Sequence, residues 1–577
     1  TNLIPVMVCP ASVEKNWRPL FDDLGIRPEV ISTGIVSGGR KESSKNRLKL
    51  INRTNLLAVD EIHNFYGTSS NRTKNLSENL ADSRIFMTAT PINKEFQDLI
   101  KLMNLLGTEE LDGETFSRLK ILKDNIMSLD KKKRMEARKQ ANKLIQKFMV
   151  RRTRNDLRYI VENRGNEYLL ESGRIANYPE YVAVDYSLNS QEDDEIISEI
   201  SSYTKELLGI ARISSLRLTN EQKKLGITEK QTLDRILKSQ PALSEYNVWK
   251  MLDSSVPALY EHLRGTGELE KKLDWLSGKE KPTYAQGVIN KLREMTMPEW
   301  GFSEEFKQDK TVPNWLLDYK EFEDAKNNEI KLYESILELT DKLSNSRFNS
   351  KINCIVESIK NNEKTVVFET SNITLLFLEK ELTKLGVEAH TFIGSTKGNK
   401  RKKVDEAEEL FGLDSDNRSR VALLSDMMSE GINLQGSSTL IHLTTPSTIR
   451  LAEQRVGRVD RMNTRFNEIK IYYPKKDLLS SQMRPYLKER NKLVGDVIGS
   501  NIILPNDDNE IDKLSEEGEE MLSSIEMNEK MFSERNGLFD AFHDVRELIG
   551  EEGLISSLEY EEMRTSNAKV MAYVGYV

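Results

Sequence analysis

The chain has 577 residues, of which 31% are charged and 38% hydrophobic, and its formal net charge is −8. This composition excludes a wholly disordered chain and predicts three or four structural units of about 150 residues each. No apolar run reaches the about 18 residues of a membrane-spanning helix. Two cysteines, Cys9 and Cys354, are too few for a disulfide framework or a four-thiolate zinc site. We therefore expect a cytoplasmic protein with no membrane partner.

Charge is unevenly distributed along the chain. Residues 501–577 hold 19 Asp and Glu against 6 Lys and Arg, a balance of −13, which leaves +5 on the remainder. An acidic tail behind a mildly basic body is compatible with nucleic-acid binding, and equally with an ordinary solvated surface.

Short apolar runs that end at polar residues alternate with helical stretches at both ends of the chain. They lie at Val6–Cys9, Leu56–Val59, Ile85–Met87, Thr365–Phe368, Val421–Leu424, Thr439–His442 and Ile469–Tyr472. Parallel sheets bury such strands on both faces and bind ligands at the strands' carboxyl ends. The two sets of runs therefore predict two parallel-sheet α/β lobes.

The middle of the chain is charged and has the periodicity of helices. Leu332, Ile336, Leu339 and Leu343 follow the 4-3-4 spacing of an amphipathic helix. We therefore expect a first lobe at 1–160, a mostly helical insertion at 161–345, a second lobe at 346–500 and an acidic helical C-terminal region at 501–577.

The second predicted strand is followed directly by Asp60-Glu61-Ile62-His63. A carboxylate at the carboxyl end of a strand can hold Mg²⁺ beside a nucleotide's phosphates, and a second one can polarise an attacking water. An ordinary strand-end turn with two surface acids explains the tetrapeptide equally well.

Two later segments carry further polar side chains. Thr88-Ala89-Thr90-Pro91 closes the third predicted strand, and its two hydroxyls could bond the carboxylate loop. In the block Gln454–Arg461, Arg458 and Arg461 are three residues apart and share one face of a helix. Fixed arginines can neutralise the charge that builds on a transferring phosphoryl group. The alternative is the basic face of a surface helix.

Together these segments resemble motifs II, III and VI of superfamily-two helicases, in the family's order. The chain is more specifically similar to Swi/Snf-type translocases and to their RapA-like branch. The similarity rests on Cys9–Trp17 (motif Ia), Arg151–Leu157 (the Arg-Arg-Thr segment), Gly394–Thr396 (the Gly-Ser-Thr loop) and Ser429–Gln435 (motif V). This resemblance covers about 1–160 and 345–480, and it implies two RecA-like lobes with ATP and Mg²⁺ bound between them.

The resemblance also implies roles for individual residues. Asp60 would position Mg²⁺, Glu61 would activate water, and Arg458 and Arg461 would act as arginine fingers. His63, Gln454 and Gly431 would contact the nucleotide or link the two lobes. Thr88 and Thr90 would pass the nucleotide state on to the rest of the protein. A nucleic-acid backbone would lie along Pro10, Ala11, Gly394, Ser395, Thr396, Ser429 and Asn433.

One family element has no counterpart in the sequence. No Gly-x-x-x-x-Gly-Lys-Ser/Thr phosphate loop occurs, and the one Gly-Lys pair, Gly278-Lys279, is followed by Glu280. In the family this loop lies shortly before motif Ia. We therefore expect an N-terminally truncated fragment, inactive alone because nothing cradles the β-phosphate.

The leading hypothesis is an ATP-dependent double-stranded DNA translocase that remodels or displaces protein–DNA complexes. Its expected source is bacterial, archaeal or phage, and its expected partner is RNA polymerase or a defence-system protein. A strand-separating DNA or RNA helicase stays open, because it shares motifs II, III and VI. A nucleotide-dead nucleic-acid-binding scaffold also stays open, because the phosphate loop is missing.

Overall fold

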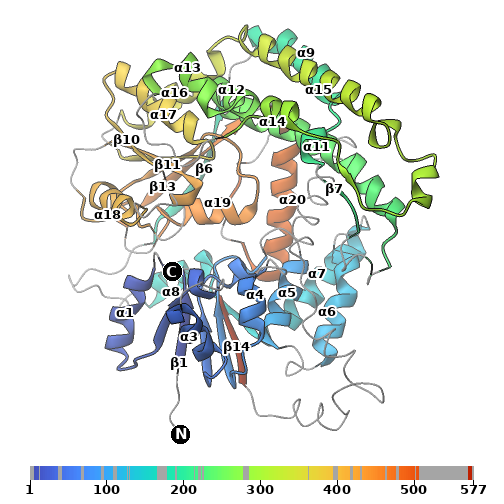
Figure 1. The fold of residues 1–577 in the computed structure, drawn as a ribbon. Helices are drawn as coiled ribbons and strands as arrows, with labels where there is room; N and C mark the ends of the chain where they lie inside the picture. Colours follow the sequence, from blue (N-terminus) through green and yellow to red (C-terminus); the bar gives the residue numbers. More distant parts are fainter. Residues whose placement is uncertain are drawn as a thin grey trace.

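Two parallel sheets lie one above the other in the computed structural model, and a set of helices extends from the upper one (Figure 1). The structure describes residues 569–574 and most of residues 5–505. Within 5–505 it leaves out 12, 37–41, 67–70, 93–95, 108–112, 127, 129, 165–177, 189–190, 214, 219–222, 224–225, 277–284, 361–362, 394–399, 416–419, 429–431, 462–463, 476–477, 479 and 501.

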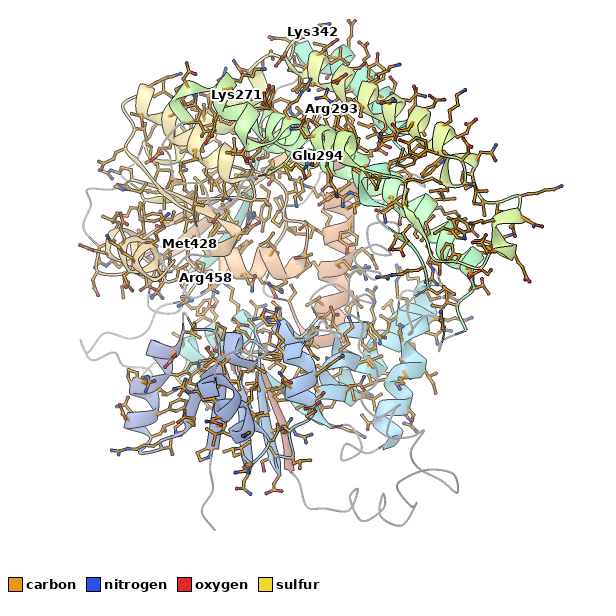
Figure 2. The ribbon with its side chains drawn as sticks, in the orientation of Figure 1. Lys271, Arg293, Glu294, Lys342, Met428 and Arg458 are labelled. Atoms are coloured by element: carbon orange, nitrogen blue, oxygen red, sulfur yellow. The ribbon has the colours of Figure 1, made fainter. Side chains whose placement is uncertain are left out.

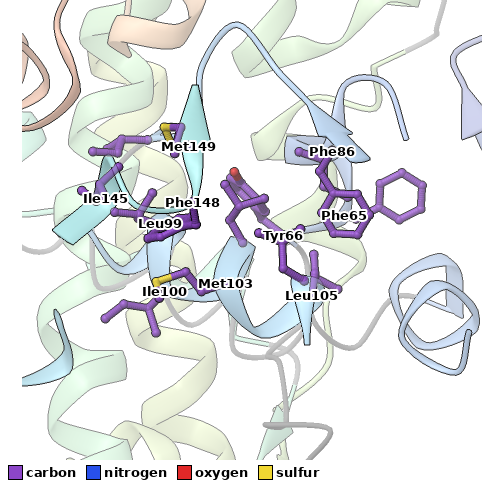
Figure 3. Close-up of a cluster of buried hydrophobic side chains, with 14 of the residues drawn as sticks. Phe65, Tyr66, Phe86, Leu99, Ile100, Met103, Leu105, Ile145, Phe148 and Met149 are labelled. Carbon is purple, nitrogen blue, oxygen red and sulfur yellow. The ribbon is translucent and has the colours of Figure 1, made fainter. Parts of the chain in front are cut away.

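The first lobe is built on six parallel strands in the order β2-β1-β3-β4-β14-β5. These strands are β1 (Pro5–Cys9), β2 (Glu29–Ser32), β3 (Leu56–Val59), β4 (Ser83–Met87), β5 (Met149–Arg151) and β14 (Lys569–Val574). Its helices are α1 (Glu14–Asp23), α2 (Thr33–Val36), α3 (Glu42–Ile51), α4 (Asn71–Ser77), α5 (Gln97–Leu106), α6 (Gly113–Ile126) and α7 (Lys131–Ile145). Apolar side chains of the sheet, α5 and α7 meet in a buried core that includes Phe86, Leu99 and Met149 (Figure 3).

Strand β14 comes from the far end of the chain and lies in the interior of this sheet. It pairs with β4 on one side, with Met571 opposite Ile85, and with β5 on the other, with Ala572 opposite Met149. Of the C-terminal region predicted to be helical, 501–577, the structure describes residues 502–505, which are neither helix nor strand, and residues 569–574, which form β14. The latter form a strand because an apolar run rich in β-branched and aromatic residues suits a position hydrogen-bonded on both sides.

The second lobe has a sheet of six parallel strands in the order β10-β11-β9-β12-β13-β6. Its strands are β6 (Glu180–Ser187), β9 (Thr365–Glu369), β10 (Ala389–Phe392), β11 (Val421–Ser425), β12 (Thr439–His442) and β13 (Glu468–Lys475). Its helices are α16 (Ser346–Ser358), α17 (Asn372–Lys384), α18 (Lys400–Phe411) and α19 (Ile449–Val456). Strand β6 belongs to the segment predicted as the helical insertion, and it joins the edge of this sheet beside β13.

The insertion between the two lobes is mostly helical, as the sequence predicts. Its helices are α9 (Asp194–Lys205), α11 (Glu229–Ser254), α12 (Val256–Arg264), α13 (Thr266–Lys272), α14 (Val288–Glu294) and α15 (Tyr319–Thr340), beside the two short strands β7 (Ser215–Leu216) and β8 (Glu299–Trp300). Ile336 and Leu339 of the predicted amphipathic helix face the buried core of this region.

Two helices link the lobes. Helix α8 (Arg154–Asn163) follows β5, and helix α20 (Ser480–Ile498) descends from the second lobe to the first (Figure 1). Leu493 and Val497 of α20 belong to the core of the first lobe. The guanidinium group of Arg138, 1% exposed, lies 2.8 Å from the Glu489 carboxylate and 3.0 Å from that of Asp496. The basic helix predicted around Lys131 thus turns one arginine inward to hold α20.

All seven apolar runs predicted as strands are strands, and the predicted fold class of two parallel-sheet α/β lobes is confirmed. Among the described residues, no helix has the length and the apolar character needed to cross a bilayer.

Candidate functional site

Asp60 lies at the carboxyl edge of the first sheet. Its backbone N–H donates to the Val8 carbonyl at 2.8 Å, so the strand pairing of β3 with β1 extends to this residue. Its Oδ1 accepts the Glu61 N–H at 2.8 Å, and its Oδ2 accepts the Trp17 indole N–H at 3.0 Å. Burial raises the pKa of Asp60 to about 6, and the neighbouring charge of Glu61 acts in the same direction.

Glu61 has φ 52° and ψ 49°, the one positive φ outside glycine in the described part of the chain. This left-handed conformation is unfavourable for a residue with a Cβ, and such residues concentrate at functional sites. The turn directs the Glu61 carboxylate to His63, whose Nδ1 lies 3.2 Å from Glu61 Oε2 and 2.9 Å from Thr88 Oγ1. Glu61, His63 and Thr88 are thus joined by contacts between neighbouring strand ends.

Arginines of the second lobe act on the Glu61 carboxylate. Burial alone would raise the pKa of Glu61, but His63 and the charges of Arg458 and Arg450 together hold this pKa below its usual value. At neutral pH, Glu61 is therefore ionised, which is the state that a general base or a water-orienting group requires. Arg458 lies on the side of the second lobe that faces the first (Figure 2).

The two predicted finger residues lie in a tight turn after α19. Arg458 donates from Nε to the Gln454 carbonyl at 3.0 Å and from Nη1 to the Ile432 carbonyl at 3.3 Å. Arg461 donates from Nε to the Gly457 carbonyl at 2.8 Å. Both guanidinium groups thus hydrogen-bond to carbonyls of their own lobe.

The third segment, after β4, is buried beneath the carboxylate loop. The exposed fractions of Thr88 and Thr90 are 3% and 2%. The Thr90 N–H donates to Thr88 Oγ1 at 3.1 Å, and the Ala89 carbonyl accepts Arg151 Nη1 at 3.0 Å. Arg151 Nη2 also lies 3.7 Å from the Glu453 carboxylate of α19, so this arginine connects the threonine segment to the second lobe.

The residues predicted to line a nucleic-acid backbone are only partly covered by the structure. Half-buried Pro10 and exposed Ala11 follow β1, at the same sheet edge as Asp60. The Asn433 N–H donates to Glu408 Oε1 at 3.0 Å. The others, Gly394, Ser395, Thr396 and Ser429, lie outside the described residues. Gly431, which was predicted to contact the nucleotide, also lies outside them.

Several contacts at the site were not predicted from the sequence. Trp17 stacks on Phe21 with a centroid distance of 5.6 Å, and its indole N–H donates to Asp60. Arg455 is fully buried and donates from Nε to Asp426 Oδ1 at 3.0 Å, so it supports α19 from within the second lobe. No local pattern identifies these partners, because each lies on a different element.

The carboxylates fit Mg²⁺ held together with a nucleotide rather than in a cage of protein ligands. Mg²⁺ prefers oxygen ligands and is usually bound by one or two carboxylates plus phosphates and water. Asp60 and Glu61 supply such oxygens, and no group of three or more His, Cys, Asp or Glu that could hold a metal occurs among the described residues. Buried Thr90 Oγ1 and His63 Nε2 have no hydrogen-bond partner in the described part of the chain, which leaves polar atoms for a ligand.

Two family descriptions match the chain, one in each lobe. Residues 28–170 match the SNF2-related domain, and residues 350–463 match the helicase conserved C-terminal domain. The first stretch contains the carboxylate loop Asp60–His63 and the threonine segment Thr88–Pro91, and the second contains the turn that carries Arg458 and Arg461 (the arginine turn).

Local similarity extends to curated proteins. The chain is 28% identical over 168 residues to the uncharacterized ATP-dependent helicase YqhH of Bacillus subtilis, covering 29% of each chain. It is 33% identical over 130 residues to the RNA polymerase-associated protein RapA of Photobacterium profundum, which is 22% of this chain and 13% of that protein. The matched stretches thus span less than a third of the relatives' own length.

The chain is also similar to a solved structure titled "Sulfolobus solfataricus SWI2/SNF2 ATPase core in complex with dsDNA". The match covers 86% of this chain and 82% of that chain, with 16% sequence identity and a TM-score of 0.25.

Proposed function

Because this chain belongs to the Swi/Snf type of superfamily-two helicases, we propose that its two RecA-like lobes form the engine of an ATP-dependent double-stranded DNA translocase. One observation carries the proposal: an ionised carboxylate of the first lobe, Glu61, lies within the electrostatic reach of Arg458 from the second. Hydrolysis of a phosphoanhydride needs a group that orients water and a cation that neutralises the developing charge. The two lobes supply one each.

In this proposal Asp60 holds Mg²⁺, Glu61 orients the attacking water, and Arg458 and Arg461 approach the γ-phosphate. The nucleotide supplies the phosphoanhydride whose cleavage drives the cycle. Arg458 and Arg461 leave the carbonyls of Gln454 and Gly457 to reach it, because each guanidinium group now donates to its own lobe. Opening and closing of the lobes then moves the chain along DNA.

The DNA would lie along Pro10, Ala11, Gly394, Ser395, Thr396, Ser429 and Asn433. Contacts through backbone amides and hydroxyls suit a translocase, because the phosphates of a duplex carry no sequence information. The complex it displaces would be a protein on DNA. RNA polymerase is the first to test, because a relative with local similarity, the RapA protein of Photobacterium profundum, carries the name RNA polymerase-associated protein.

The test is ATP hydrolysis by the chain and by its full reading frame, measured alone and with duplex DNA, single-stranded DNA or RNA. We expect the strongest stimulation with duplex DNA. Glu61→Gln should lower the DNA-stimulated rate by about 100-fold or more with DNA binding unchanged, since it removes the water-orienting carboxylate. Glu78→Gln, an exposed carboxylate of the same lobe, is the matched control and should hydrolyse ATP normally.

The same assay separates the alternatives. Preferential stimulation by single strands, together with unwinding of a tailed duplex, would replace the translocase by a helicase. DNA binding without hydrolysis in any form of the chain would favour the nucleotide-dead scaffold, which the missing phosphate-loop sequence supports.

A further inference from the structure

The segment Arg151–Arg154 carries the chain from the first lobe to the second. Arg151 ends β5 of the first sheet and donates to the Ala89 carbonyl at 3.0 Å. Three residues later, Arg154 begins α8, and its Nε lies 2.8 Å from Asp460 Oδ2 of the second lobe. Arg151 thus contacts the first sheet and, through Glu453, also the second lobe, whereas Arg154 pairs with the second lobe.

Arg154 is enclosed by the second lobe. Its guanidinium carbon lies 5.3 Å from the ring centre of Tyr178 and 5.4 Å from that of Tyr181, a residue of β6, and its Nη2 donates to the Pro179 carbonyl. The side chains of Arg154 and Asp460 are 6% and 0% exposed. Such a buried ion pair is held firmly, because separating the partners leaves a charge without solvent or counter-charge.

Asp460 has a particular place in the sequence, between the two predicted fingers Arg458 and Arg461. Its own N–H donates to the Val456 carbonyl at 2.9 Å, and the Arg461 N–H donates to the Val459 carbonyl at 3.1 Å, so the turn is closed by backbone bonds. A displacement of the Asp460 side chain therefore moves both arginines with it.

A second crossing between the lobes lies against the first. Ile498 at the end of α20 belongs to the first lobe's core, whereas Ile502 belongs to the second lobe's core. Gly499 between them has φ +83°, and a Cβ built on it would lie 2.6 Å from Thr153 Cγ2. The chain thus passes between the lobes at two adjacent places. Because both of these crossings are covalent links, the lobes move most easily by rotating about the line that joins them.

We propose that Arg151–Arg154 and Gly499 form the pivot between the lobes, and that the Arg154–Asp460 ion pair transmits lobe rotation to the turn that carries Arg458 and Arg461. Arg154 is a positioning residue in this account, since it acts through Asp460. The catalytic part of the inference rests on the proposed function, whereas the pivot itself does not.

The test compares Arg154→Met with Arg154→Met/Asp460→Asn, which removes both charges. Spin labels on exposed Asn52→Cys and Thr383→Cys, with Cys9→Ala and Cys354→Ala, report the distance between the lobes by double electron–electron resonance. Arg158→Met is the matched control, because Arg158 lies one turn along α8 and pairs with Glu162 in an exposed position.

We expect Arg154→Met to melt well below the wild type, since it strands the Asp460 carboxylate, and the double variant to regain most of that loss. The distance distribution should be broader in both variants than in the wild type. In both, kcat should fall by up to about 100-fold with little change in KM, because the arginines lose their placement. Arg158→Met should match the wild type in every readout.

A double variant with the wild-type distance distribution and the wild-type kcat would overturn the inference and leave the pair a structural element. If the wild type hydrolyses no ATP, the proposed function fails, and the distance distribution still decides whether Arg154 holds the lobes.

Discussion

Neutralising Asp60 is expected to stabilise the first lobe while removing its predicted metal ligand. In the folded chain, burial and the adjacent Glu61 charge raise the pKa of Asp60 from 3.8 to about 6. The folded state therefore binds this proton more tightly than the unfolded state. Between about pH 4 and 6, stability falls as the pH rises, and above pH 6 the full cost of the buried charge remains.

The size of this cost follows from the same values. A tenfold difference in proton affinity is worth about 1.4 kcal/mol, so a pKa of about 6 against 3.8 costs at most about 3 kcal/mol at pH 7.5. At pH 4.5 the same titration leaves a cost of about 1 kcal/mol. Each kcal/mol moves the melting midpoint of a domain of this size by about 2–4 °C. The Asn amide keeps only one acceptor oxygen for the Glu61 and Trp17 N–H groups, and the lost hydrogen bond offsets about 1 kcal/mol of this gain. Asp60→Asn should therefore raise the midpoint at pH 7.5 by roughly 4–8 °C.

The assay is thermal melting in metal-free buffer at both pH values, with Asp23→Asn, an exposed carboxylate at the end of α1, as the control. The gain from Asp60→Asn should nearly vanish at pH 4.5, where the cost of the buried charge and that of the lost hydrogen bond are about equal, and the control should gain nothing at either pH. An Asp60→Asn protein that melts at or below the wild type at pH 7.5 would refute the reasoning. So would a gain that does not depend on pH.

Three further outcomes are expected. Arg458→Ala should lower kcat for DNA-stimulated hydrolysis by about 10³-fold, as measured by steady-state kinetics, with DNA affinity unchanged. Arg138→Met should destabilise the first lobe by about 1–3 kcal/mol in urea unfolding, because α20 loses its charged hydrogen bonds. Gly209→Ala should cost more than about 2 kcal/mol, since its Cβ would meet the Gln240 carbonyl carbon and oxygen at 2.5 Å. Gly226→Ala, with a similar φ of +68° and nothing within 4 Å, should cost only about 1 kcal/mol, and equal losses would contradict the steric argument.

The local character of each strand could be predicted from the sequence. Leu56–Val59 and Val421–Leu424 are short apolar runs ended by polar residues, and that pattern depends only on burial of both faces of a strand. The carboxylate pair at Asp60 was found for the same reason, because the end of a strand is visible in the sequence. The roles assigned to it remain predictions.

Sheet order and partner choice could not be predicted in this way. Nothing in residues 180–187 or 569–574 indicates that they join sheets whose other strands lie far away in the chain. In the sequence, Trp17 and Arg154 show only that they belong to helices. Their contacts with Asp60 and Asp460 form only when folding brings distant segments together. The spacing of apolar residues and the polar residues that end each run are local features of the sequence. They were enough to predict the strands and helices and the candidate carboxylates Asp60 and Glu61. The pKa of Asp60, the strained turn at Glu61 and the ion pair between Arg154 and Asp460 depend on burial and charge from distant segments, so only the tertiary structure decided them.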